Sequence, residues 1–226
     1  MIESVSPALL LDLDGTLVDS VCRPVVARPE ALERAGIDLC IWKIHRRVGM
    51  RGCLFATALV GEIGRELTAV QEESIRRDHD QSFQRLSRDV QPLPAALERL
   101  SAEGTPWAIA TSGTMATARA SLEQLRIPAG VPVITHAQVS FAKPNPDLGL
   151  AAAAQLKVSI ADAIVVGDST GDILAARRAR ALGIGLLSGG YGREELETVG
   201  AFRVYDDPAD LLRHLYELGI RGGRRP

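Results

Sequence analysis

The residues LLLDLDGTLVDS, positions 9–20, place two acidic side chains at the end of an apolar run. Asp12 and Asp14 are two positions apart, so their carboxylates point to the same face of an extended chain. Their like charges repel each other unless a cation or a proton intervenes. An ionised carboxylate is also costly beside a buried strand. The stretch therefore predicts a site that holds positive charge, with Asp12 and Asp14 as candidates for chemistry.

Further polar residues follow other apolar runs downstream. They are Thr111, Ser112 and Gly113 at the end of PWAIATSG, Lys143 in FAKPNPD, and Asp168 and Asp172 in IVVGDSTGD. Carboxylate oxygens select a hard divalent cation such as Mg²⁺, whereas N–H groups, a hydroxyl and a lysine neutralise phosphoryl oxygens. If these residues converge, the sequence predicts a site for magnesium and a phosphate group.

The elements that must position these residues can be read from the apolar pattern. Strands are predicted at 9–14, 106–111, 131–135, 162–168, 184–190 and 202–206, and helices at 114–126, 146–156, 171–182 and 207–218, with a shorter helix before the last strand. This alternation indicates an α/β fold, a Rossmann-like parallel sheet with helices on both faces. Ligands bind such a sheet beyond the carboxyl ends of its strands, where the polar residues are expected.

The segment between the first two strands has a different pattern. Helices are predicted at about 39–47, 51–63 and 66–87, preceded by a helix that ends at Ala35-Gly36. Pro24 and Pro29 lie in that first helix, which we expect to begin near Pro29 or to kink there, because an interior proline costs about 3 kcal/mol. We predict an α/β core domain of residues 1–19 and 90–226, and an inserted all-helical domain of residues 20–89.

The composition indicates which classes of binding partner are expected. The 226 residues are 46% hydrophobic and 24% charged, and the net charge of −2 gives no general attraction to nucleic acid or anionic membrane. The opening MIESVSPALL lacks the features of a secretory signal, and no apolar run approaches the ~18 residues of a membrane span. We expect a cytoplasmic protein with a small-molecule partner; the sequence does not define its oligomeric state. Cys22, Cys40 and Cys53 form no CxxC pair and are expected to be buried or half-buried free thiols.

The order of DLDGTLVDS, KPNPD and VVGDSTGD resembles the haloacid dehalogenase superfamily over nearly the whole chain. The similarity is to its phosphatase branch with a helical C1-type cap, which includes phosphoglycolate phosphatases and β-phosphoglucomutase-like proteins. It implies magnesium-dependent hydrolysis of a small phosphate monoester, a phosphorylated metabolite, through an aspartyl-phosphate intermediate. The inserted helical domain would be the cap.

The resemblance also implies a role for each acidic residue. Asp12 is the nucleophile, and Asp14 is the general acid and base that protonates the leaving oxygen and then activates water. Magnesium is held by Asp12, the backbone carbonyl of Asp14 and Asp168. Asp172 supports the metal, directly or through water.

The remaining site residues bind phosphate or substrate. The resemblance implies that Thr111, with Ser112 and Gly113, binds the phosphoryl oxygens and that Lys143 bridges the nucleophile and the phosphate. In the inserted domain, HRRVGMRG at 45–52 offers Arg47 and Arg51 as candidate substrate contacts, although a solvated helix face is the default explanation for such charge. His45 and His136 lack metal-ligand spacing and are interpreted as ordinary structural residues.

Other readings of the motifs stay open. Taken alone, Asp14-Gly15-Thr16 is typical of a turn and Asp168-Ser169 of a helix cap. A phosphosugar mutase of the β-phosphoglucomutase type would share nearly all these residues, but such enzymes more often have Glu-Asp where this chain has Gly167-Asp168. A haloacid dehalogenase does not usually carry the second aspartate, here Asp14, and a non-catalytic metabolite-binding protein would not need the full set. Hydrolysis is favoured.

Overall fold

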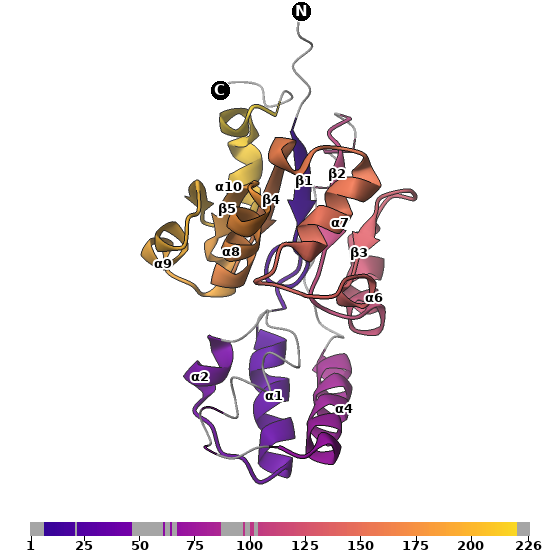
Figure 1. Ribbon diagram of the computed structural model, residues 1–226, viewed down its shortest axis with the longest axis vertical. Helices are drawn as coiled ribbons and strands as arrows, with labels where there is room; N and C mark the ends of the chain where they lie inside the picture. Colours follow the sequence, from indigo (N-terminus) through magenta and orange to yellow (C-terminus); the bar gives the residue numbers. More distant parts are fainter. Residues whose placement is uncertain are drawn as a thin grey trace, which may run out of the picture.

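The computed structural model describes residues 7–20, 22–46, 61, 64, 67–86, 97, 100–101 and 104–220 (Figure 1). Of the helix predicted at 51–63, residue 61 is the part that lies inside these ranges.

Six parallel strands form one sheet in the order β3-β2-β1-β4-β5-β6. The strands are β1 (Ala8–Leu11), β2 (Trp107–Ala110), β3 (Val133–Ile134), β4 (Ala163–Gly167), β5 (Leu182–Leu186) and β6 (Arg203–Tyr205). From β1 the chain proceeds to one side through β2 and β3, and from β4 it proceeds to the other side. The order therefore reverses between β1 and β4, and in such sheets ligands bind at this point.

Helices cover both faces of the sheet, as predicted (Figure 1). They are α6 (Met115–Leu125), α7 (Asp147–Leu156), α8 (Thr170–Ala179), α9 (Arg193–Thr198) and α10 (Pro208–Arg213), with 3-10 turns at His136–Gln138, Ile160–Asp162, Leu187–Gly189 and Leu215–Leu218. Because strand side chains alternate, Leu9 and Leu11 join one buried cluster, with α6 and α10, while Ala8 and Leu10 join another, with α7 and α8. Both faces are apolar, which explains the continuous apolar runs of the strands.

Among the described residues, three further helices lie beyond one end of the sheet (Figure 1). These helices, α1 (Cys22–Arg34), α2 (Ile41–His45) and α4 (Ala69–Leu86), are called the helical insert below. They have a buried cluster of their own, in which Leu32, Ile37 and Ile44 pack together and Ile75 of α4 packs against them. The helical insert and the sheet therefore bury separate sets of apolar side chains.

Helix α1 contradicts one of its two predicted alternatives. It begins at Cys22 and runs through Pro29, so the predicted start near Pro29 is wrong, while the alternative of a kink at Pro29 stays a prediction. Pro24 falls in the first turn, where a backbone N–H has no helical acceptor, so a proline is tolerated there. Pro29 in the interior does remove one helical hydrogen bond. The predicted end is confirmed, because Gly36 follows the helix with a φ of 70°.

Two surface expectations can also be compared with the structure. Cys40, expected to be buried or half-buried, is an exposed free thiol at the start of α2, so that prediction is wrong for this residue. In the part of the chain that the structure describes, no helix is long and apolar enough to cross a membrane.

Candidate active site

The strand ends bring four predicted site residues together. Asp12 follows β1, and its backbone N–H donates to the Val166 carbonyl of β4 at 2.9 Å. Lys143 Nζ lies 2.5 Å from Asp12 Oδ1 and 2.6 Å from Asp172 Oδ1. Asp12, Asp168 and Asp172 each offer a carboxylate oxygen within 4.8 Å of the others, so the group could hold a metal ion. The predicted convergence is found for these four side chains.

Asp172 is fixed by the start of α8. Ser169 donates to Asp172 Oδ2 from its backbone N–H at 3.1 Å and from its hydroxyl at 2.6 Å, in a capping box. A Cβ atom on Gly167 would lie 2.2 Å from Asp172 Cγ, so a residue with a side chain does not fit at position 167 while Asp172 is in this position. The cap that the sequence suggested here therefore exists, and its carboxylate also pairs with Lys143.

Two hydroxyls of the DGTLVDS turn orient two further carboxylates. Thr16 Oγ1 donates to Asp168 Oδ1 at 2.9 Å, and Ser20 Oγ donates to Asp14 Oδ1 at 2.6 Å. Thr16 and Ser20 are both buried. The sequence pattern alone assigns neither hydroxyl to catalysis or binding, although both lie inside the motif that carries the resemblance.

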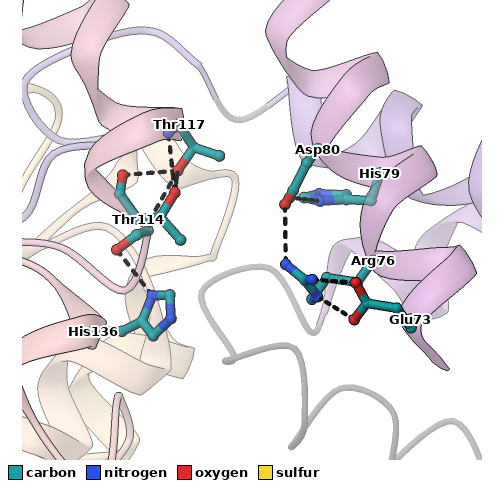
Figure 2. A network of polar contacts seen from close by, with 8 residues as sticks. Glu73, Arg76, His79, Asp80, Thr114, Thr117 and His136 are labelled. Atoms are coloured by element: carbon teal, nitrogen blue, oxygen red, sulfur yellow. Dashed lines mark hydrogen bonds and ion pairs between the residues drawn. The ribbon is translucent and has the colours of Figure 1, made fainter. Parts of the chain in front are cut away.

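Thr111, Ser112 and Gly113 form a loop between β2 and α6. The Gly113 N–H donates to Thr111 Oγ1 at 3.0 Å, which leaves the proton of that hydroxyl free to be donated to another group. Ser112 Oγ is buried and has no hydrogen-bond partner among the residues that the structure describes. Thr114 caps the following helix by accepting from the Thr117 N–H at 3.1 Å (Figure 2). Two hydroxyls therefore remain available in this loop.

Two histidines that were interpreted as ordinary structural residues contact loops of the site. His136 lies beside the start of α6 (Figure 2), with its backbone N 3.3 Å and its Nδ1 3.1 Å from the Gly113 carbonyl oxygen. His45 Nε2 lies 3.2 Å from the Gly189 carbonyl oxygen. In each case the nitrogen that faces the carbonyl must carry the proton. No local motif marks these contacts, because each joins distant parts of the chain.

Figure 2 also shows a polar network on α4. Arg76 Nε donates to Glu73 Oε2 at 2.9 Å, while another guanidinium nitrogen lies 3.8 Å from Asp80. His79 Nδ1 lies 3.1 Å from Asp80 Oδ1. Because Arg76 and Glu73 are exposed, water screens their attraction, and we interpret the network as a solvated helix face rather than a site.

The electrostatics of the acidic group indicate that it can accept a cation. Burial raises the pKa of Asp12 to about 7 against the opposing charge of Lys143, with Asp172 and Asp14 adding to the rise. Burial, followed by the charges of Asp172 and Asp12, raises the pKa of Asp168 well above its usual value. Burial would lower the pKa of Lys143, but its two carboxylate partners outweigh this effect and raise it. Three carboxylates thus share one ammonium among the described residues, and their oxygens suit a hard divalent cation.

The candidate substrate residues Arg47 and Arg51 lie outside the described residues. Their proposed contacts stay predictions.

The fold and these strand-end residues place the protein among α/β enzymes whose chemistry lies at one edge of a parallel sheet. Residues 7–180 match the haloacid dehalogenase-like hydrolase family, and the chain belongs to it. The predicted resemblance is therefore confirmed.

Three similar proteins agree with this assignment. Hexitol phosphatase A of Escherichia coli is 31% identical over 75% of this chain and 78% of its own length. A phosphoglycolate phosphatase of Rhodospirillum rubrum is 32% identical over 90% of this chain and 88% of its own. The crystal structure of a hydrolase from Pseudomonas syringae superposes with a TM-score of 0.90 at 45% identity, covering 93% of this chain and 98% of that one.

Proposed function

We propose that the protein is a magnesium-dependent phosphatase that hydrolyses a small phosphate monoester through an aspartyl-phosphate on Asp12. The observation that carries this proposal is the position of Lys143, 2.5 Å from Asp12 and 2.6 Å from Asp172, beside the carboxylate of Asp168. Relatives that are named phosphatases support it.

Magnesium would be held by Asp12, Asp168 and the backbone carbonyl of Asp14. Both oxygens of Asp172 are already engaged, one by Lys143 and one by Ser169. We therefore assign Asp172 to the positioning of Lys143 rather than to direct metal ligation. When bound, the cation supplies positive charge that neutralises the phosphoryl oxygens and orients the phosphate.

The first chemical step forms the covalent intermediate. A carboxylate oxygen of Asp12 attacks phosphorus, the bond from phosphorus to the ester oxygen breaks, and Asp14 gives its proton to the leaving oxygen. The charge of Lys143 opposes the rise in the Asp12 pKa, which favours the ionised nucleophile, and it neutralises charge on the phosphoryl group. The Ser20 hydroxyl donates to Oδ1 of Asp14 and so orients this carboxyl group.

The second step releases phosphate. Asp14, now ionised, takes a proton from water as the water oxygen attacks phosphorus, and the bond from phosphorus to Asp12 breaks. Inorganic phosphate leaves, and Asp14 holds the proton that the next cycle needs.

Binding of the phosphoryl group falls to the loop after β2. The Thr111 hydroxyl has a free proton because its oxygen accepts from Gly113, and Ser112 Oγ is buried without a partner within the described ranges. Both hydroxyls, together with N–H groups at the start of α6, suit phosphoryl oxygens.

We propose further that residues 20–89 form a cap over this site. Support comes from the separate apolar cluster of the helical insert and from the contact of its His45 with Gly189, in the loop after β5. Closure of a cap would exclude water from the reacting groups. Arg47 and Arg51 remain its candidate substrate contacts.

The mutase alternative is disfavoured by position 167. A Cβ atom there would lie 2.2 Å from Asp172 Cγ, so the Glu-Asp pair more usual in such mutases would displace Asp172 from Lys143. A dehalogenase is disfavoured by Asp14, which would have no leaving oxygen to protonate.

The test is a screen for phosphate release across phosphorylated metabolites, including hexitol phosphates and phosphoglycolate, with Mg²⁺ and with excess EDTA. We expect release from at least one substrate with Mg²⁺, and none in EDTA or with Asp12→Asn. Isomerisation of a sugar phosphate without net release would identify a mutase instead. Release that continues in EDTA after verified metal removal would refute the metal requirement.

A further inference from the structure

The loop after β5 joins three parts of the molecule. This loop, residues 187–191 with the sequence LSGGY, is called the β5 loop below. Ser188 Oγ donates to the Gly15 carbonyl at 2.6 Å, in the turn that carries Asp14 and Thr16. Gly189 lies against Asp168, since a Cβ atom on it would be 2.1 Å from Asp168 Oδ2 and 2.4 Å from the Asp168 carbonyl oxygen. The β5 loop therefore borders the proposed metal ligand directly.

The helical insert contacts the same loop through the end of α2. His45 Nε2 lies 3.2 Å from the Gly189 carbonyl oxygen, and the His45 ring stacks on Tyr191 with centroids 5.9 Å apart. The Tyr191 hydroxyl donates to the Arg46 carbonyl at 3.0 Å. The Arg46 guanidinium lies 5.1 Å from the centre of the Tyr191 ring and forms an ion pair with Glu195.

These contacts differ in how much they stabilise the position of the helical insert against the β5 loop. The Arg46 and Glu195 side chains are 43% and 37% exposed, so water screens their attraction and the pair contributes little by itself. Gly189 and Tyr191 are buried. The carbonyl of the buried Gly189 would therefore lose the half-buried His45 as a partner if His45 moved away, which makes His45 the more consequential contact.

Asp168 has close neighbours on two sides. Thr16 Oγ1 donates to Oδ1, and Gly189 lies beside the carboxylate, where a Cβ atom would come within 2.1 Å of Oδ2. The β5 loop touches both sides, because Ser188 binds the carbonyl of Gly15, next to Thr16. A shift of this loop would therefore change the orientation of Asp168.

We propose that His45 is a positioning residue for Asp168, acting through Gly189, so that seating of the helical insert and binding of the divalent cation favour each other. This inference rests on the proposed function, in which Asp168 is a metal ligand. Because coupling between two binding events is reciprocal, a change that weakens the His45 contact must weaken cation binding, and cation binding must stabilise the seated insert.

The test measures cation binding by the full chain without substrate. Mn²⁺, which takes the same oxygen ligands as Mg²⁺, is titrated while free Mn²⁺ is followed by electron paramagnetic resonance. His45→Phe keeps an aromatic ring on Tyr191 but removes the nitrogen, and we expect it to raise the Mn²⁺ Kd about threefold to tenfold. His45→Gln places an amide near the position of Nε2 and should recover most of the affinity.

His214 provides a matched control. Its Nδ1 lies 2.9 Å from the carbonyl oxygen of Asp210 in α10. Its ring stacks on Tyr205 of β6, with centroids 5.6 Å apart. His214→Phe therefore removes the same kind of contact away from the acidic group and should leave the Mn²⁺ Kd unchanged. Circular dichroism of each variant checks that it folds.

The possible results separate the two proposals. An unchanged Kd in His45→Phe, with normal binding by the wild type, overturns the inference and leaves the proposed function standing. An equal loss in His45→Phe and His214→Phe also overturns it, because the effect would be general destabilisation. Absence of Mn²⁺ binding in the wild type would refute the proposed metal site itself, and the inference with it.

Discussion

The sheet and the helical insert bury their side chains to different extents. In the sheet, β1, β2 and β4 are buried along their whole length. In the described part of the helical insert, Leu32, Ile37 and Ile44 are the buried members of the cluster, and α4 carries exposed ion pairs on its surface. The acidic groups thus project from buried strands, whereas the described part of the insert contacts the β5 loop through His45 and Arg46. We therefore expect substitutions of the reacting groups at the strand ends to abolish catalysis, and substitutions in the helical insert to reduce it only in part.

The largest effect is expected from Asp12→Asn, at the end of β1. The amide cannot attack phosphorus, so phosphate release should fall by about a thousandfold or more. The matched control is Asp78→Asn, a carboxylate on α4 of the helical insert, which should stay within about twofold of the wild type. Steady-state phosphate release with any substrate from the screen measures both. Equal losses of activity in the two variants would contradict the expected difference between the sheet and the helical insert.

Asp14→Asn should fail in a different way from Asp12→Asn. It removes the proton donor, which is typically worth about 10²–10⁴-fold in rate. With an activated aryl phosphate, whose leaving group needs little protonation, the first step should survive in part while dephosphorylation slows. Phosphoenzyme should then accumulate on Asp12, as measured by rapid-quench mass spectrometry. An adduct that persists in Asp12→Asn would mean that another residue is the nucleophile.

Large-to-small substitutions should separate the stability of the two regions. Ile109→Ala in β2 and Leu32→Ala in α1 each remove a fully buried side chain, at a cost of about 2–5 kcal/mol of local stability. Ile109→Ala should speed hydrogen exchange throughout the protein, whereas Leu32→Ala should speed it in α1 and α4 and leave β1 and β4 protected. Peptide-resolved hydrogen exchange measures this. Faster exchange in β1 and β4 of Leu32→Ala would mean that the two regions open as one unit.

The smallest effect is expected at His136, which holds the Gly113 carbonyl in the loop after β2. His136→Leu removes the ring contact but keeps the backbone N–H contact, and it should raise the inhibition constant of inorganic phosphate by about threefold to tenfold. His136→Asn places an amide nitrogen near the position of Nδ1 and should restore most of the affinity. If the inhibition constant stays the same in His136→Leu, His136 does not support the conformation of the phosphate-binding loop.

The sheet and the proximity of the acidic side chains could be predicted because both follow from local pattern. Apolar runs mark the strands, and parallel strands bring their carboxyl ends to one edge, so Asp12 and Asp168 could be expected to meet. Contacts such as His45 with Gly189 could not be predicted, because they depend on where the helical insert rests against the sheet.

Helix α1 and Cys40 show a second limit of local pattern. The interior cost of a proline favours a start or a kink near Pro29, but α1 already begins at Cys22, and in that first turn the missing N–H of Pro24 has no cost. Cys40 is expected to be buried or half-buried because free cysteines usually are, but its exposure depends on where α2 begins. Arg47 and Arg51 remain predictions, since they lie outside the described ranges.

The place of β1 between β2 and β4 has a consequence for how the protein is made. Thr16 and its partner Asp168 are 152 positions apart, so the ribosome adds the second roughly 8 to 30 seconds after the first at about 5–20 residues per second. Until then β1 lacks β4, one of its two neighbouring strands, and the acidic group lacks Asp168 and Asp172. A nascent chain that ends before β4 therefore carries the nucleophile in an incomplete acidic group, and the site can form only after the second half of the sheet has emerged.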